Sequence, residues 1–268
     1  MPSAALPPTG PDAALLLFGH GTSDGSGSAI ADALAAEIRA AGVFGAVATS
    51  FALQPPSPAA ALAALPQARV AVVPLLATEG GVATMVLPRL LAESGDTTRL
   101  IVLPPIGLDA EIRGIAAEIA DRAIADAGLD PRRVAVLVAG HGSTRRNASE
   151  RATGALAAAL AAMGRYGEVG AIYLEQPPLA CDWRAVTDAR DVVVVPLFVS
   201  GGRHEESDLP ELLRSKATPV DGTPMPDGRR LWLTPAIGRH PAMAGLILRR
   251  AVAALGIENT EERRETGP

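Results

Sequence analysis

The chain of 268 residues is 48% apolar, which is enough to fill the core of one large domain or of two ordinary ones. A net charge of −5, only 3% aromatic residues and the lack of any Lys/Arg run argue against a nucleic-acid partner, which requires a basic face. The start MPSAALPPTGPDA has no basic segment, and no stretch approaches the roughly eighteen apolar residues of a membrane span, so we expect a cytoplasmic protein with no membrane partner.

The first predicted strand is the apolar run at 15–18, which ends abruptly in a Gly-His-Gly triplet around His20. After this triplet, Ile30, Leu34 and Ile38 recur with helical spacing. An amphipathic helix is therefore expected to follow the strand.

The same arrangement returns later in the chain. The strand-like run 134–138 ends in a second Gly-His-Gly triplet at His141, and helical spacing follows in Leu156, Leu160 and Met163. Three further strands are predicted in this half, at 169–174, 192–199 and 231–233. Continuous apolar strands that alternate with helices are typical of a parallel sheet covered on both faces.

Four blocks of sequence occur twice in the same order. LLLFGHGTSDGSG matches VLVAGHGSTRRNA, FALQPPSPAAAL matches YLEQPPLACDWR, VAVVPLLATEGG matches VVVVPLFVSGGR, and LPPIGL matches TPAIGR. The offsets are 121, 122, 122 and 131 residues, and the last one predicts an inserted surface loop at SKATPVDGTPMPDG.

The repeat divides the chain into two halves, 12–128 and 132–256, which are joined by the linker GLDPRR and followed by a flexible, charged tail at 257–268. We predict an α/β fold with two doubly wound halves related by a pseudo-twofold axis. Each half is expected to hold a mainly parallel sheet of about four strands.

In the second half, three polar residues follow three different predicted strands. His141, Glu175 and His204 should meet at the carboxyl edge of the sheet, where open α/β folds bind ligands. Two imidazoles and a carboxylate suit a divalent metal such as Co²⁺, Fe²⁺, Ni²⁺ or Zn²⁺, and they also suit proton transfer. The sequence therefore predicts a metal site with catalytic capacity in this half.

The first half has lost most of this set. Leu53 stands opposite Glu175 in the repeat and Val82 stands opposite His204, so only His20 remains of the set. Glu79 could compensate only if its loop bends inward. We expect the first half to form a wall of the cleft, with His20 either facing the substrate or serving a turn or capping role.

Charged residues near the predicted site allow more than one interpretation. Arg145, Arg146 and Arg203 flank the two key histidines and could neutralise an acidic substrate. His240 precedes a proline in GRHPAM, which favours a role at a helix start over catalysis. A solvated acidic first turn of the helix after His204 is expected to contain Glu205, Glu206 and Asp208.

The segments LVAGHGSTRRNASERATGAL, IYLEQPPL and VVPLFVSGGRHEESDLP resemble the class II tetrapyrrole chelatases of the CbiX/SirB type, the sirohydrochlorin cobaltochelatases and ferrochelatases, in two tandem halves. Protoporphyrin ferrochelatases share the fold but usually have a glutamate in place of His204, so the two histidines favour the sirohydrochlorin branch. The usual HGSRD motif is HGSTRR and HGTSDG here, and many two-half members keep their histidines in the first half.

The resemblance implies insertion of Co²⁺ or Fe²⁺ into sirohydrochlorin, without ATP, on the route to cobalamin or sirohaem. The metal would be a substrate, and no permanently bound cofactor is implied. His141 and His204 would bind the metal and accept pyrrole protons with help from Glu175, and the arginines would meet the carboxylates of the macrocycle. The protein is expected to act as a monomer or a homodimer.

Two other functions compete with this interpretation. The loss of the first-half set is compatible with a non-catalytic carrier of tetrapyrrole or metal on a decayed chelatase fold. Histidine phosphatases also place a histidine after the first strand, but they need an arginine directly before it. Glycine occupies that position at both Gly19 and Gly140.

Overall fold

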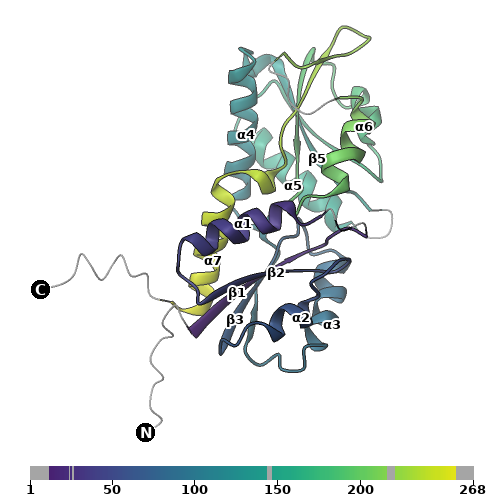
Figure 1. Ribbon diagram of the computed structural model, residues 1–268. Helices are drawn as coiled ribbons and strands as arrows, with labels where there is room; N and C mark the ends of the chain where they lie inside the picture. Colours follow the sequence, from purple (N-terminus) through teal and green to yellow (C-terminus); the bar gives the residue numbers. More distant parts are fainter. Residues whose placement is uncertain (1–11, 24, 26, 144–146, 216–220, 258–268) are drawn as a thin grey trace, which may run out of the picture.

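The computed structural model describes residues 12–23, 25, 27–143, 147–215 and 221–257, with the side chain of His204 outside the described part (Figure 1). The first half contains β1 (Ala13–Gly19), α1 (Ala29–Ala40), β2 (Ala46–Phe51), α2 (Pro58–Ala63), β3 (Arg69–Pro74), the π-helix η2 (Val82–Val86), α3 (Leu87–Ala92), β4 (Leu100–Val102), η3 (Ile106–Leu108) and α4 (Ile112–Asp126). The second half contains η4 (Pro131–Arg133), β5 (Val134–Gly140), α5 (Ala148–Ala162), β6 (Glu168–Tyr173), η5 (Ala180–Ala185), β7 (Asp191–Pro196), the π-helix η6 (His204–Asp208), α6 (Leu209–Leu213), β8 (Thr223–Pro224), β9 (Arg230–Leu233), η7 (Ile237–Arg239) and α7 (Ala242–Leu255).

The strands form two sheets with equivalent order. The first sheet runs β2-β1-β3-β4 and the second runs β6-β5-β7-β9-β8, with all neighbours parallel except β8 and β9. The chain order reverses beside β1 in one sheet and beside β5 in the other, and such switch points are where open α/β sheets bind ligands. The predicted α/β fold with two mainly parallel sheets is confirmed.

The described part of the inserted segment in the second half, from residue 221 onward, includes a strand. It contains the short strand β8, whose Thr223 pairs with Leu231 and whose Pro224 pairs with Arg230 of β9. Met225 is buried and helps to close this hairpin. The expected surface loop therefore contains a short strand at 223–224, where an otherwise exposed edge of β9 gains backbone hydrogen bonds.

The last helix of each half packs on the sheet of the other half. α4 contacts β7 and α5 of the second half, whereas α7 contacts β3 and α1 of the first. In Figure 1, α4 accordingly lies beside α5 and β5, and α7 lies beside α1 and β1. The ranges 12–128 and 132–256 thus describe the sequence repeat. In the structure, the last helix of each repeat covers the sheet of the other.

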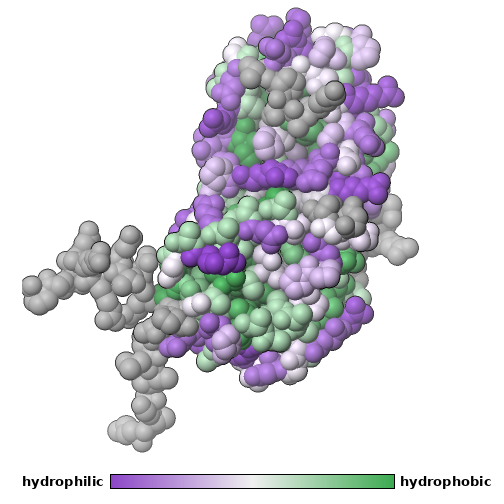
Figure 2. All heavy atoms as spheres, in the orientation of Figure 1, coloured by the Kyte–Doolittle hydropathy of each residue, from purple (hydrophilic) through white to green (hydrophobic). Residues whose placement is uncertain are grey.

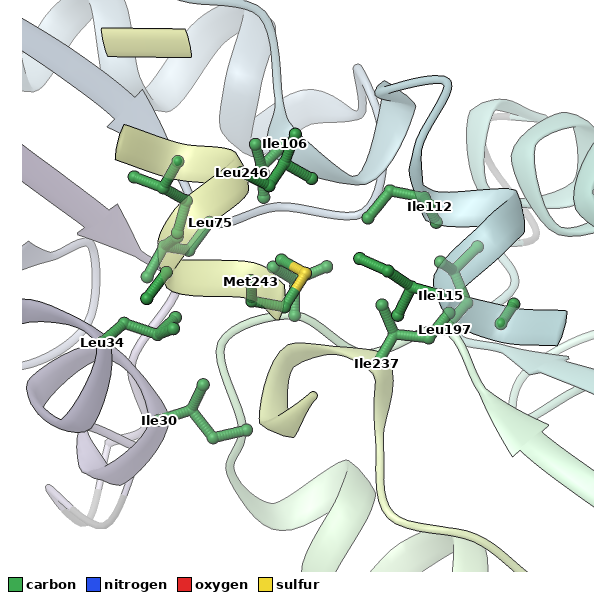
Figure 3. Packing of buried hydrophobic residues seen from close by; sticks show 14 of the residues in the cluster. Ile30, Leu34, Leu75, Ile106, Ile112, Ile115, Leu197, Ile237, Met243 and Leu246 are labelled. Carbon is green, nitrogen blue, oxygen red and sulfur yellow. The ribbon is translucent and has the colours of Figure 1, made fainter. Parts of the chain in front are cut away.

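This exchange produces one hydrophobic core that runs through both halves. Met243 and Leu246 of α7 pack near Leu75, while Ile115 of α4 packs near Leu197 (Figure 3). All five side chains are buried, and full burial of such a side chain stabilises the fold by about 1.5–3 kcal/mol. The relative position of the two halves is therefore fixed by apolar packing and not by the linker.

The predicted amphipathic helices bury the expected faces. Ile30, Leu34 and Ile38 of α1 are buried, as are Leu156 and Leu160 of α5. On the face shown in Figure 2, hydrophilic residues cover most of the second half, and apolar residues form larger areas on the first. Among the described residues, no helix is both long and apolar enough to span a bilayer.

Candidate active site

A cavity of about 550 Å³ lies between the two halves, at the carboxyl ends of strands from both sheets. Its volume is within the range of small-molecule sites. The loops after both Gly-His-Gly triplets line it, together with residues of the segments 75–83 and 197–205. His20 and His141 therefore line the same cavity from different halves.

The Gly-His-Gly loop after β5 is held in place by side chains that follow it in the sequence. The Gly142 N–H donates to Ser149 Oγ at 2.9 Å, and the Ser143 N–H donates to Gln176 Oε1 at 2.7 Å. Gly142 has a φ of 78°, and a Cβ at this position would lie 2.9 Å from Gln176 Cγ. Glycine is thus required by both the backbone conformation and the close approach of the glutamine.

His141 and Glu175 are brought together at the ends of β5 and β6. The backbone N–H of Glu175 donates to the carbonyl oxygen of His141 at 3.0 Å. Their side chains also meet, with 3.6 Å between Nδ1 of His141 and Oε2 of Glu175. The predicted convergence of this histidine with this glutamate is confirmed.

The contacts of Nδ1 indicate the tautomer of the His141 imidazole. His141 Nδ1 lies 2.9 Å from the carbonyl oxygen of Gly142, which can only accept, so Nδ1 carries the proton. The neutral ring then has its lone pair on Nε2. An imidazole whose other nitrogen donates to a carbonyl is the usual arrangement for binding a metal, and it can also accept a proton.

The remaining predicted residues of this site are placed only in part. The backbone at His204 begins the π-helix η6, but its side chain is outside the described part of the structure. Arg145 and Arg146 lie outside the described residues altogether. Arg203 lines the cavity and forms an ion pair with Asp208 at 3.1 Å. Within the part of the chain that the structure describes, no three His, Cys, Asp or Glu side chains form a metal-binding group.

Glu205 differs from the solvated residue that the sequence predicted. Its side chain is only 10% exposed, and its Oε1 accepts hydrogen bonds from Arg239 Nε at 2.6 Å and from the Ala236 N–H at 3.3 Å. The hydrogen bond to Glu205 raises the pKa of Arg239 above its ordinary value, so the guanidinium stays charged. The buried Oε2 has no hydrogen-bond partner among the described residues.

The expectation for this acidic turn was wrong for Glu205 because Arg239 is distant in the sequence and draws the carboxylate inward. Glu206, by contrast, is 44% exposed and lies 3.4 Å from Arg239. Both members of the Glu205–Arg239 pair are absent from the first half, where the repeat has Ala83 and Leu108. The inward-facing ion pair therefore belongs to the half that also contains His141.

His20 occupies the position in the first half that His141 has in the second. Its loop is held in the same way, because the Thr22 N–H donates to Gln54 Oε1 at 2.8 Å and the Leu53 N–H donates to the His20 carbonyl oxygen at 3.0 Å. Glu79 is exposed and lies outside the cavity lining. His20 thus lines the cavity without the glutamate that accompanies His141.

His240 lies outside the cavity lining, at the start of α7. Its Nδ1 accepts a hydrogen bond from the Ala242 N–H at 3.3 Å, and its Nε2 lies 3.6 Å from Glu118 Oε2. The predicted role at a helix start is confirmed.

Comparisons with known proteins identify the family of this chain. The family model of CbiX matches the chain twice, at residues 14–123 and 135–254. A protein of Halobacterium salinarum named as a probable sirohydrochlorin cobaltochelatase is 31% identical over 269 aligned residues, which cover 90% of this chain and 91% of the relative. The chain belongs to the CbiX family.

Two solved structures share the fold. The structure of CbiX, the terminal enzyme for biosynthesis of siroheme in denitrifying bacteria, has a TM-score of 0.70 and 26% identity, with 90% of this chain and 98% of that chain covered. A multi-domain protein of Deinococcus radiodurans with structural similarity to chelatases has a TM-score of 0.70 and 24% identity. The match covers 90% of this chain but 54% of the Deinococcus protein, which has two additional novel domains.

In this CbiX-family chain, sequence reasoning missed the glutamines that hold the two histidine loops. Gln54 and Gln176 belong to the repeated LQPP and EQPP blocks, and each accepts a hydrogen bond from the residue that follows the Gly-His-Gly triplet. Gln176 is buried. The duplication of the glutamine was a usable signal, because a residue kept in both copies at a strand end has the same neighbours in both.

Proposed function

We propose that this protein is a metal chelatase that inserts Co²⁺ or Fe²⁺ into sirohydrochlorin without ATP, on the route to cobalamin or sirohaem. Membership of the CbiX family supports this reaction, as do the name of the Halobacterium relative and the similarity to the siroheme enzyme. The observation that carries the proposal is the pairing of His141 with Glu175 in a cavity at the switch point of the sheets.

The chemistry of metal insertion accounts for these two groups. A divalent cation must be held next to the macrocycle, and two pyrrole N–H protons must be accepted as the metal enters. The lone pair on Nε2 of His141 suits both tasks, while the adjacent carboxylate of Glu175 stabilises positive charge on the metal or on the protonated ring. The metal is a substrate and leaves in the product.

Other residues complete the proposed site. We assign the second metal-binding imidazole to His204, because its backbone begins η6 between the cavity-lining residues Arg203 and Glu205. Arg145, Arg146 and Arg203 bind the peripheral carboxylates of sirohydrochlorin. His20 contacts the macrocycle from the other half of the cavity, where a single imidazole cannot hold a metal without further ligands.

The initial rate of metal insertion tests this function. Purified protein is mixed with sirohydrochlorin and Co²⁺, or anaerobically with Fe²⁺, and the absorbance change is compared with the spontaneous reaction. We expect acceleration with no added ATP. Tight binding of macrocycle or metal with an unaccelerated reaction would instead identify a carrier and overturn the proposal.

Removing the Gln176 side chain should impair catalysis through the position of His141. Gln176→Ala leaves the Ser143 N–H without its acceptor, and a shift of the loop by a fraction of an ångström misplaces the imidazole. We expect kcat for Co²⁺ insertion to fall about tenfold with KM for sirohydrochlorin changed less than about twofold.

Gln54→Ala is the matched control, because it removes the same hydrogen bond in the other half. It should reduce kcat less than Gln176→Ala does, at a similar loss of unfolding free energy. Equal reductions of kcat by the two variants would contradict a specific role of Gln176 in positioning His141.

The cavity is lined by both halves of one chain, which supports activity as a monomer or as a homodimer with one complete site in each copy. We propose the cytoplasm as its location. Size-exclusion chromatography combined with the insertion assay tests whether activity depends on association.

A further inference from the structure

The cavity has two walls of different chemistry, although both derive from the same repeat. Glu175, Arg203 and Glu205 line the second-half wall. The equivalent first-half positions, which also line the cavity, have uncharged residues, namely Leu53, Gly81 and Ala83. Of the ionisable residues in the described lining, only His20 belongs to the first half.

We propose that the first-half wall is an apolar platform for one face of the tetrapyrrole ring, so that metal enters and protons leave only through the opposite face, toward the second half. This inference rests on the proposed function and adds which wall binds the ring and which carries out the chemistry. The platform consists of Leu53, Leu76, Val82 and Ala83.

Leu53 is the residue that most clearly indicates a ligand-binding surface. Leu53 is 55% exposed and lies two residues after the end of β2, where its N–H donates to the carbonyl oxygen of His20. Leu53, Met85, Val102 and Leu108 are the exposed large apolar side chains of the described residues, and Leu53 is the one among them that lines the cavity. When an apolar ligand covers an exposed leucine, apolar surface of both is removed from water, and this favours binding of the ligand.

The shape of the substrate fits this division. The ring system of a tetrapyrrole is flat and apolar on its faces, while its carboxylates lie at the rim. An uncharged wall matches a face of the ring and would leave rim carboxylates without partners. The second-half wall has the imidazole of His141 and the carboxylate of Glu175, which the metal and the departing protons need.

The platform is tested by Leu53→Asn, which keeps an uncharged side chain but removes its apolar character. The matched control is Leu108→Asn, because Leu108 is also an exposed leucine of the first half, at 44%, and lies outside the cavity lining. Two binding measurements are made: sirohydrochlorin without metal, by fluorescence quenching, and Co²⁺ without macrocycle, by calorimetry. The kcat and KM of Co²⁺ insertion are determined for all three proteins.

We expect Leu53→Asn to raise the Kd and KM for sirohydrochlorin about tenfold, the effect of about 1.4 kcal/mol of lost burial. Its Co²⁺ affinity and kcat should stay within about twofold of the wild type, and Leu108→Asn should change nothing. The platform proposal would be overturned if Leu53→Asn bound sirohydrochlorin as the wild type does, or if it lost kcat or Co²⁺ binding. In either case, acceleration of the reaction by the wild-type protein would still support the chelatase function. A wild-type protein that binds no macrocycle would overturn both.

Discussion

His141→Ala is expected to slow Co²⁺ insertion into sirohydrochlorin by about 100-fold or more, to near the spontaneous rate. The substitution removes the Nε2 lone pair that holds the metal or accepts a pyrrole proton, and it leaves Glu175 without its imidazole neighbour. The side chain is 39% exposed, so its loss should change the free energy of unfolding little. Initial rates by absorbance and a urea unfolding curve measure the two effects.

His20→Ala is the matched control, because the same Gly-His-Gly loop carries this histidine in the other half. His20 has Leu53 where His141 has Glu175, so it should contribute to ring binding and not to the chemistry. We expect a rise in KM of less than about tenfold with kcat nearly unchanged. A larger loss of kcat in His20→Ala than in His141→Ala would place the metal chemistry in the first half and contradict the proposed site.

Gly238→Ala should destabilise the protein by about 3 kcal/mol. A Cβ at Gly238 would overlap the carbonyl oxygen of Val199 and would lie 2.7 Å from its carbonyl carbon and 2.9 Å from its Cα. The Gly238 N–H also donates to the Phe198 carbonyl oxygen at 2.9 Å, so the two backbones cannot separate without losing this bond. Phe198 and Val199 both line the cavity, and the insertion rate should therefore fall together with stability.

Gly154→Ala provides the control for the glycine substitution. Gly154 lies within α5, and a Cβ there meets nothing within 4 Å. Replacing a helical glycine by alanine should stabilise the protein by about 0.5–1 kcal/mol. If Gly238→Ala and Gly154→Ala shifted the urea midpoint by the same amount in the same direction, the close contact of Gly238 with Val199 would not limit stability.

The sequence repeat allowed much of the fold to be predicted. Apolar runs such as 134–138 lie where β5 forms, and the equivalent strand orders of the two sheets follow from the duplication. The exchange of α4 and α7 was not predictable in the same way. Each helix has one apolar face that fits either sheet, and only the three-dimensional packing near Leu75 and Leu197 decides which one it covers.

The candidate site was predictable where backbone topology determines proximity. His141 and Glu175 meet because adjacent parallel strands end side by side, which the repeat and the strand pattern already implied. The Glu205–Arg239 ion pair depends instead on the conformations of two side chains that are distant in the sequence. Its signal was the simultaneous replacement of Ala83 and Leu108 by opposite charges in the second copy, which is visible only when both repeats are compared.

Whether the second half performs the metal chemistry is tested most directly by the initial rate of Co²⁺ insertion in Glu175→Leu. This variant gives the second half the residue that the first half has at Leu53, and because Glu175 is 56% exposed the fold should tolerate it. Glu37→Leu, at an exposed position of α1 outside the cavity lining, controls for the change of charge.

We predict that Glu175→Leu lowers the rate about 100-fold with sirohydrochlorin binding within about twofold of the wild type, and that Glu37→Leu retains the full rate. A Glu175→Leu protein that inserts Co²⁺ at the wild-type rate would contradict a site built on His141 and Glu175.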